Sequence, residues 1–168
     1  YFKCRIYEGS SGYAEVDKAF SDWIDNTKNV NQVLIGGMAI VNYDIDRTTT
    51  DVDFLFLSNS DIPTNVYGFK KHRGNAFQHN NTHVEIEVVT NSFINIPFEF
   101  TQLIFDTSYQ KDGFKIASPS AIVAMKLRRF SLRDKEDIES LMRAYDIDIS
   151  IFEPFLSEKE IANYLSLC

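Results

Sequence analysis

The sequence is poor in cysteine and has no long apolar run. Only two cysteines, Cys4 and Cys168, occur among the 168 residues, near opposite ends of the chain. No Cys-x-x-Cys pair or Cys/His spacing indicates a zinc site, so we expect two free thiols in a reducing compartment. No stretch approaches the roughly 20 apolar residues of a membrane-spanning helix. We therefore expect a cytoplasmic protein with no membrane partner.

Positive charge is also in deficit. The chain has 17 Lys and Arg against 24 Asp and Glu, which gives a net charge of -7 and a pI of about 4.9. Such a balance excludes attraction of nucleic acid by the chain as a whole, but a local basic patch can still bind it. A solvated face is the commoner meaning of a short basic run. Two such runs occur, one formed by Lys70, Lys71, His72 and Arg73 and the other by Lys126, Arg128, Arg129 and Arg133.

Apolar and aromatic residues are plentiful. Hydrophobic residues make up 44% of the chain and aromatic residues 14%. This content is enough for a packed core and excludes a disordered chain. We therefore expect one ordinary domain over residues 1–168.

Strand-like patterns lie mainly in the middle of the chain. Val84, Ile86 and Val88 alternate with Glu85 and Glu87, as in a strand with one buried face. Similar short runs predict strands over 32–35, 51–57, 83–90 and 114–117, a weak strand or hairpin over 68–79, and an N-terminal strand around Phe2, Cys4 and Ile6 followed by a turn over 9–12.

Helical patterns precede and follow these strands. Apolar residues at helical spacing predict a helix over 14–29, and a short helix is expected over 38–43. Ser118-Pro119 is a favourable helix start, and Ser157-x-x-Glu160 is a capping-box pattern. The later helices are expected over 118–130, over 133–145, and from Ser157 to near the C-terminus.

Together these patterns predict an α+β fold, or a loosely wound α/β fold. A small mixed sheet would occupy the core, residues 32–117, and the C-terminal part, residues 118–168, would be helical.

The most informative segment joins a glycine pair to a pair of aspartates. Gly36 and Gly37 lie between a predicted strand and a predicted helix, where the backbone can approach a ligand and free N–H groups favour phosphate. Asp51 and Asp53 are two residues apart on a strand, so their carboxylates project from one face. Two adjacent carboxylates repel each other, and magnesium or manganese would offset that repulsion. The segment predicts a site for a divalent cation and a nucleoside triphosphate.

A third acid would complete such a metal site. Glu85 and Glu87 share one strand and one face, and either could reach the metal. We favour Glu87, because it directly precedes the apolar end of that strand.

These motifs resemble those of minimal nucleotidyltransferases of the DNA polymerase beta superfamily. The resemblance rests on Gly36-Gly37 followed by Arg47-x-Thr-x-Asp51-Val-Asp53, and it is closest to the bacterial branch of AbiEii-like and MenT-like toxins. A later segment resembles that branch's "ALxAxK…RxKDxxDL" region, and it includes Lys126, Arg133 and Asp137. The resemblance covers roughly residues 32–142, whereas the first thirty residues have no counterpart in it.

The resemblance implies roles for individual residues. Gly36 and Gly37 would embrace the triphosphate, and Lys126 would contact its phosphates. Asp137 would hold Lys126 or help to activate the acceptor, and Arg47 would steady the metal loop or a phosphate. Asp51, Asp53 and Glu87 would bind the metal.

The resemblance also implies a function. We expect magnesium-dependent transfer of a nucleotide from a triphosphate to a hydroxyl acceptor, which could be an RNA 3′ end, a protein side chain or a small molecule. The resemblance favours tRNA or another RNA and a toxin–antitoxin or phage-defence setting. A cognate antitoxin or other partner protein would then exist. The alternative is a catalytically weak or inactive module that keeps the fold and binds nucleotide or protein, because the turn is Gly-Gly rather than the Gly-Ser of many active members and the third acid is Glu.

Overall fold

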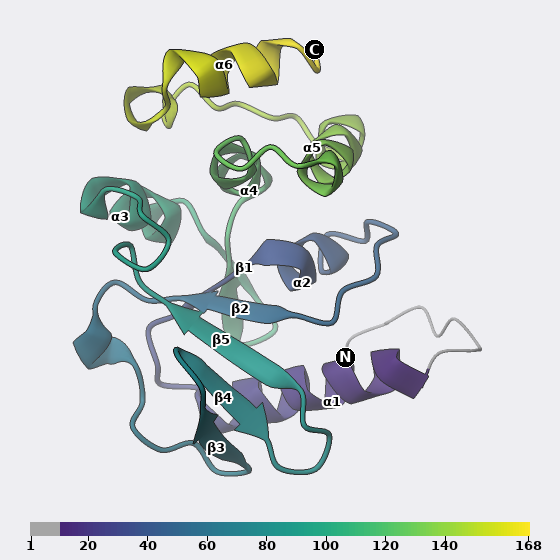
Figure 1. Cartoon of the computed structure of the whole chain (residues 1–168), viewed down its shortest axis with the longest axis vertical. Coiled ribbons are helices and arrows are strands. Elements are labelled where there is room, and N and C mark those ends of the chain that lie inside the picture. The colour runs from purple at the N-terminus through teal and green to yellow at the C-terminus, as the bar shows by residue number, and fades with distance from the viewer. Residues whose placement is uncertain (1–10) are drawn as a thin grey trace.

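A computed structural model of the chain describes residues 11–168 (Figure 1). The strand expected around Phe2, Cys4 and Ile6 lies outside these residues, whereas Cys168 is an exposed free thiol. No helix within residues 11–168 is both long and apolar enough to cross a lipid bilayer.

A seven-stranded mixed sheet forms the centre of the molecule. Its spatial order is β3-β4-β5-β2-β1-β7-β6, in which β2 pairs with β5 and β1 pairs with β7 in parallel, and the other neighbours are antiparallel. The strands are β1 (Val33–Ile35), β2 (Val52–Leu55), β3 (Phe69–His72), β4 (Ala76–His79), β5 (Glu85–Val89), β6 (Tyr109–Lys111) and β7 (Phe114–Ile116).

Six α-helices within residues 11–168 accompany this sheet, and the expected α+β fold is confirmed. Helix α1 lies against one face, whereas α2 to α4 lie on the other side, with α5 beside α4 and α6 beyond both (Figure 1). The helices are α1 (Ser11–Asn26), α2 (Gly36–Val41), α3 (Phe98–Asp106), α4 (Pro119–Lys126), α5 (Leu132–Ala144) and α6 (Glu158–Leu165), and short 3-10 turns cover Asn59–Asp61 and Glu153–Phe155.

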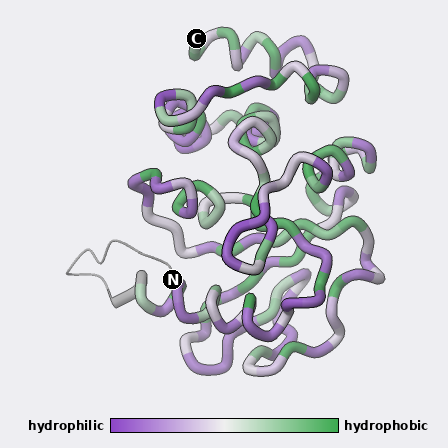
Figure 2. The backbone as a smooth tube through the Cα atoms, turned by 180° about the vertical axis from the view of Figure 1, so that it is seen from behind, coloured by the Kyte–Doolittle hydropathy of each residue, from purple (hydrophilic) through white to green (hydrophobic). Residues whose placement is uncertain are grey.

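Aromatic packing fixes α1 on the sheet. Trp23 is fully buried and stacks at 6.0 Å on Phe54 of β2, and its ring meets Phe69 and Phe77 at 5.2 Å. Rings at these separations add favourable contact beyond the area that they bury. Figure 2, seen from behind, shows hydrophobic residues concentrated along the central strands and hydrophilic residues along many outer loops.

Several expected boundaries shift for local reasons. Helix α1 begins at Ser11, so the expected turn over 9–12 is wrong at Ser11 and Gly12, and α1 ends at Asn26 rather than at residue 29. Helix α4 ends at Lys126, four residues early, because Phe130 has a positive φ of 50° and Ser131 starts the next helix with a capping box. Strand β5 begins at Glu85, since His83 has a φ of 61°.

Two elements were not expected from the sequence. Helix α3 buries Phe100 and Ile104 although no side chain caps its start, where Pro97 is the N-cap. Strand β6 adds an edge to the sheet through a hairpin with β7. The expected capping box of α6 is confirmed: the Ser157 side chain accepts from the Glu160 N–H, and the Glu160 carboxylate accepts from the Ser157 N–H at 2.6 Å.

The core packing leads to a prediction about stability. Phe54→Ala should lower the free energy of unfolding by about 3–5 kcal/mol, because the site is fully enclosed and the cavity cannot collapse completely. Tyr67→Ala is the matched control, since this aromatic side chain is 86% exposed and its removal should change stability by less than about 0.5 kcal/mol. Urea unfolding measures both; equal midpoints for the two variants would contradict the assigned core.

Candidate functional site

The glycine turn lies directly against the Asp53 carboxyl group. Gly36 begins α2 with a φ of +70°, and a Cβ atom built on it would lie 2.4 Å from Asp53 Oδ2. Both the backbone conformation and this close approach require glycine. Since Ile35 and Asp53 pair across β1 and β2, the turn and the aspartate are held together by the sheet register.

Gly37 provides room for the loop that precedes β2. A Cβ atom there would lie 2.0 Å from Arg47 Nη1 and 2.6 Å from Thr49 Oγ1. The second glycine therefore lets this loop pack against α2. Packing of this loop therefore explains why residue 37 is glycine, independently of any bound phosphate.

Asp53 and Glu87 form a close carboxyl pair. They are register partners in the parallel β2–β5 pairing, so their side chains lie side by side on one face. Burial, the charge of Glu87, hydrogen bonding with Glu87 and the charge of Asp51 together raise the pKa of Asp53 to about 7, against a smaller lowering by Lys126. The pair thus retains a proton near neutral pH unless a cation compensates the second charge.

Asp51 lies just before β2 and is more open to solvent than Asp53. Its carboxylate accepts a hydrogen bond from the Thr50 hydroxyl at 3.3 Å, and its backbone N–H donates to Thr49 Oγ1. Within residues 11–168, no three His, Cys, Asp or Glu side chains are already gathered as a metal-binding group. The structure brings Asp53 and Glu87 together, and Asp51, just before β2, is close enough for its charge to raise the pKa of Asp53.

A buried ionic network joins the loop before β2 to the helical part of the chain. Asp137 of α5 accepts from Arg47 Nε at 2.7 Å through Oδ1, and Lys126 Nζ of α4 lies 2.8 Å from its Oδ2. These side chains are only 6–13% exposed. Asp137 therefore lies beside Lys126 and is also bound to the loop that carries Arg47.

The same network contains an aspartate that the sequence patterns did not identify. Asp134 lies 3.2 Å from Lys126 Nζ and accepts two hydrogen bonds from Arg129, at 2.8 and 2.9 Å. Burial alone would raise the pKa of Asp134, but hydrogen bonds from Arg129 and Ser131 and the charge of Lys126 hold it well below its usual range. The sequence pattern that could have identified Asp134 is Ser131-x-x-Asp134, because Asp134 also completes the capping box of α5.

Arg133 has a different partner from Arg129. Its guanidinium donates to the backbone oxygen of Thr48 at 2.6 Å, which is a further contact between α5 and the loop before β2. His72 and His79 pair with Glu85 and Asp22, respectively, at 3.0 and 2.9 Å.

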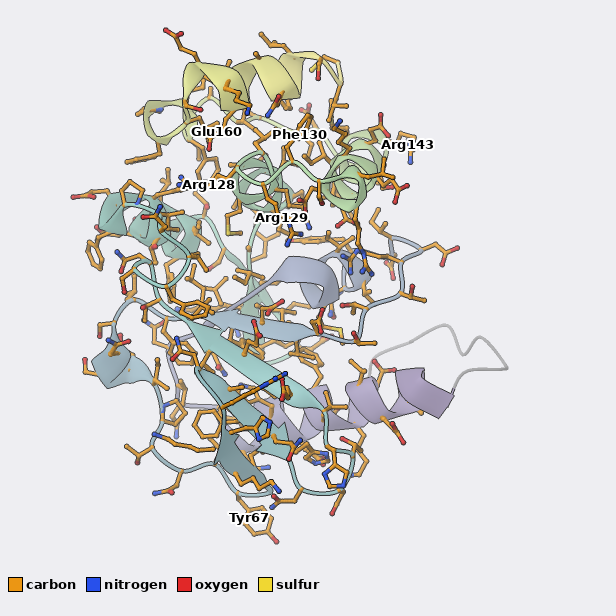
Figure 3. The ribbon with its side chains drawn as sticks, viewed as in Figure 1. Tyr67, Arg128, Arg129, Phe130, Arg143 and Glu160 are labelled. Carbon is orange, nitrogen blue, oxygen red and sulfur yellow. The ribbon has the colours of Figure 1, made fainter. Side chains whose placement is uncertain are left out.

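A cleft of about 360 Å³ opens beside Gly36 and Lys126. Its volume is within the range of roughly 300–1,000 Å³ typical of small-molecule sites. The lining is mainly apolar, and its charged part, which we call the rim, consists of Lys126, Arg128, Arg129 and Asp134. Figure 3 shows Arg128 and Arg129 beside α4. The apolar lining residues are Ile35, Ile94, Ile96, Ile122 and Met125.

The cleft could receive a ligand with a flat apolar part and an anionic tail. Its apolar walls suit a base, and its rim supplies positive charge. Asp53 lies against Gly36, which also lines this cleft, and the Asp53–Glu87 pair could hold a divalent cation, because carboxylates together with substrate phosphates are common magnesium ligands.

The Asp53–Glu87 pair leads to a pH-dependent stability prediction. In the unfolded chain Asp53 loses its proton near its ordinary pKa of 3.8, whereas in the folded chain it keeps the proton up to about pH 7. The free energy of unfolding therefore falls as the pH rises from about 4 to about 7. In EDTA at pH 8, Asp53→Asn should therefore be more stable than the parent by about 1–3 kcal/mol, with little difference at pH 4. Urea unfolding with exposed Asp25→Asn as control tests this, and an equal gain at both pH values would refute it.

The buried network leads to a second stability prediction. Asp134→Ala should cost about 3–5 kcal/mol, because Lys126 and Arg129 lose a shared counter-ion and α5 loses its capping box. Exposed Glu136→Ala on the same helix should change stability by less than about 0.5 kcal/mol. Thermal and urea unfolding measure both variants, and a mild Asp134→Ala effect would mean that water replaces the carboxylate.

Comparison with protein families identifies the family of the chain. The model of a family described as "Nucleotidyltransferase of unknown function (DUF6036)" matches residues 12–166. No curated protein matches the chain.

Two solved structures from Helicobacter pylori share the fold. One is JHP933, with a TM-score of 0.55 and 18% identity, covering 92% of this chain and 73% of that one. The other is described as a putative nucleotidyltransferase, with a TM-score of 0.56 and 18% identity, covering 95% of this chain and 77% of that one.

Proposed function

The chain belongs to the DUF6036 family of nucleotidyltransferases, and on that premise we propose that it moves a nucleoside monophosphate from a triphosphate to a hydroxyl acceptor, with magnesium or manganese as cofactor. The observation that carries this proposal is the Asp53–Glu87 carboxyl pair, which lies against the Gly36 turn at the side of an apolar, cation-rimmed cleft.

The acids present fit a divalent cation. Asp53 and Glu87 are paired in register, and the pKa of Asp53, raised to about 7 by burial and by Glu87, reflects uncompensated negative charge. Asp53, Glu87 and Asp51 would hold the cation together with phosphate oxygens of the substrate. A bound divalent cation would supply charge compensation for the phosphates and activate the attacking hydroxyl.

The remaining residues would bind and orient the triphosphate. The apolar walls of the cleft would hold the base, and Lys126 and Arg129 would face the phosphates. Both cations are fixed by Asp134, so little side-chain freedom is lost when phosphate binds. Asp137 is engaged by Arg47 and Lys126, which favours a holding role over activation of the acceptor. Catalysis would then rest on positioning and electrostatics.

We propose RNA, and tRNA in particular, as the acceptor. The resemblance to the AbiEii-like and MenT-like branch supports this choice and a toxin–antitoxin or phage-defence setting with a cognate partner protein. Exposed Arg128 and Arg129 at the rim of the cleft also favour a polyanionic acceptor.

A second function remains, in which the chain binds nucleotide or protein without catalysis. One observation favours it: within the described part of the chain, Asp51, Asp53 and Glu87 are not already gathered as a three-ligand metal group. In that case substitution of the aspartates would leave the biological effect intact.

The two functions are distinguished by a labelling experiment. Each of the four α-labelled NTPs is incubated with magnesium and with total tRNA or total protein. The parent should label tRNA, and Asp51→Ala/Asp53→Ala should reduce labelling by at least about 100-fold, a loss typical of removed electrostatic stabilisation.

Asp25→Ala/Asp106→Ala is the matched control, because it removes two exposed helical carboxylates. It should label tRNA like the parent. Magnesium-dependent NTP binding by the parent without any labelled product would favour the non-catalytic function.

A further inference from the structure

The face of β3, β4 and β5 next to the carboxyl pair is open. Among residues 11–168, no helix covers these strands on the side opposite to α1, whereas α2 to α4 lie over the neighbouring part of the sheet (Figure 1). Exposure agrees with this view, because Lys70 and Glu87 are exposed and Gln78 and Glu85 are partly exposed. A strip of polar side chains therefore extends from the candidate site to the edge of the sheet.

The sheet register aligns this strip with Asp53. Asp53 is opposite Glu87, Glu87 is opposite Ala76, and Ala76 is opposite His72, so these four residues form one row across four strands. Side chains opposite one another in a sheet share a face. With strands about 4.8 Å apart, the row spans about 14 Å from Asp53 to His72. Because Ala76 has a small side chain, the middle of the row projects less from the sheet than its ends do.

The far end of the row is basic. Lys70 and His72 are on the Asp53 face, and Arg73 follows them in the turn with 84% of its side chain exposed. One carboxylate, that of Glu85, pairs with both His72 and Arg73, at 3.0 and 3.8 Å. The basic groups thus outnumber the acid between them. Lys71 lies on the other face, over the ring of Phe77.

Reaction geometry assigns this strip to the acceptor. In the proposed transfer the acceptor hydroxyl gives up its proton to water and its oxygen bonds to the α-phosphorus, while the bond to pyrophosphate breaks and pyrophosphate leaves. The attacking and leaving oxygens are roughly in line on opposite sides of phosphorus. The cleft with Lys126 and Arg129 lies on the Gly36 side of Asp53 and would take the triphosphate. The acceptor hydroxyl would then come from the opposite side, which is the side of Glu87 and Ala76.

From these observations we infer that the open face of β3, β4 and β5 is the acceptor-binding surface, and that it takes the 3′ end of an RNA. The terminal hydroxyl would lie at Asp53 and Glu87, with the preceding backbone over Ala76. Lys70, His72 and Arg73 would contact phosphates further along the strand. This inference rests on the proposed function and specifies where its acceptor binds.

The test measures RNA binding separately from catalysis. Fluorescently labelled tRNA is titrated with protein carrying Asp53→Asn, without NTP, and anisotropy gives the Kd at several salt concentrations. Adding Lys70→Glu/Arg73→Glu should weaken tRNA binding at least about tenfold. It should also reduce the slope of log K against log salt by about 1.4, since each of the two lost phosphate contacts contributes about 0.7 for a single strand.

Each of two controls is matched in charge to one test variant: a double substitution to Lys70→Glu/Arg73→Glu, and Lys71→Glu to the single variant Lys70→Glu. Arg143→Glu/Lys159→Glu makes the same change in net charge as Lys70→Glu/Arg73→Glu, on exposed residues of α5 and α6. Figure 3 shows Arg143 near the end of the molecule opposite to Tyr67, which is next to β3. Lys71→Glu reverses the neighbour of Lys70 on the other face of β3. Arg143→Glu/Lys159→Glu should change the Kd by less than about twofold, because these residues are far from β3. Lys71→Glu should weaken binding less than Lys70→Glu does, because Lys71 lies on the other face. Magnesium-dependent NTP binding should be unchanged in every variant with Asp53 intact.

The outcomes separate this inference from the proposed function. Equal losses of tRNA affinity in Lys70→Glu/Arg73→Glu and in Arg143→Glu/Lys159→Glu would overturn the assigned surface. Equal effects of Lys70→Glu and Lys71→Glu on the Kd would overturn it as well. Absence of tRNA binding by the parent, or labelling of protein alone, would overturn RNA as its occupant. Binding of tRNA that depends on Lys70 and Arg73, without any nucleotide transfer, would support the surface and reject the proposed reaction.

Discussion

The Asp137 carboxylate is a buried ionic link between the loop before β2 and the C-terminal helices. One oxygen binds Arg47 in the loop before β2, and the other faces Lys126 at the end of α4. Because the group is almost fully buried, its charge is tolerated only with both cations in place. Gly37 makes room for Arg47, since any side chain there would overlap the guanidinium where it now lies and force it to move. The position of the loop that leads to Asp51 and Asp53 thus depends on a residue about 85 positions later.

The candidate site combines two groups of opposite charge. Lys126 and Arg129 share Asp134 at the rim of the cleft, whereas Asp53 is pressed against Glu87 and Gly36 with its pKa raised to about 7 by burial and by Glu87. In the first group every charge has a partner, which rigidifies it. In the second, negative charge exceeds what the protein compensates. That imbalance is what a divalent cation and a phosphate chain would resolve together.

Much of the fold could be predicted because its signals are local. Ser118-Pro119 and Ser157-x-x-Glu160 mark helix starts through capping, and alternation over Glu85–Val89 marks a strand. Helix α3 was missed because Phe-Glu-Phe at its start alternates like a strand and no side chain caps it. Its helical state is instead favoured by burial of Phe100 and Ile104, which depends on distant partners.

The site was partly predictable for the same reason. The Gly36-Gly37 and Asp51-x-Asp53 motifs are local, whereas the adjacency of Asp53 and Glu87 arises from parallel pairing of strands more than thirty residues apart. Sequence spacing left Glu85 and Glu87 as alternatives, and the register pairs Glu87 with Asp53 while Glu85 contacts His72 and Arg73 instead. The role of Gly37 in admitting Arg47 likewise needs the folded loop.

The net charge of -7 is a poor guide to what the open sheet face can bind. Exposed charges separated by more than a Debye length, about 8 Å at physiological salt, interact weakly. The acids of α5 and α6 lie at the opposite end of the molecule from β3 (Figure 1), so they barely affect a ligand at Lys70 or Arg73. Of the acids on this face, Glu85 is paired with His72 and Arg73, and Glu87 and Asp53 are those that a divalent cation would neutralise. A chain that is acidic as a whole can therefore present a locally basic surface beside its site, and the arrangement of charge, rather than its sum, decides whether a polyanion is repelled.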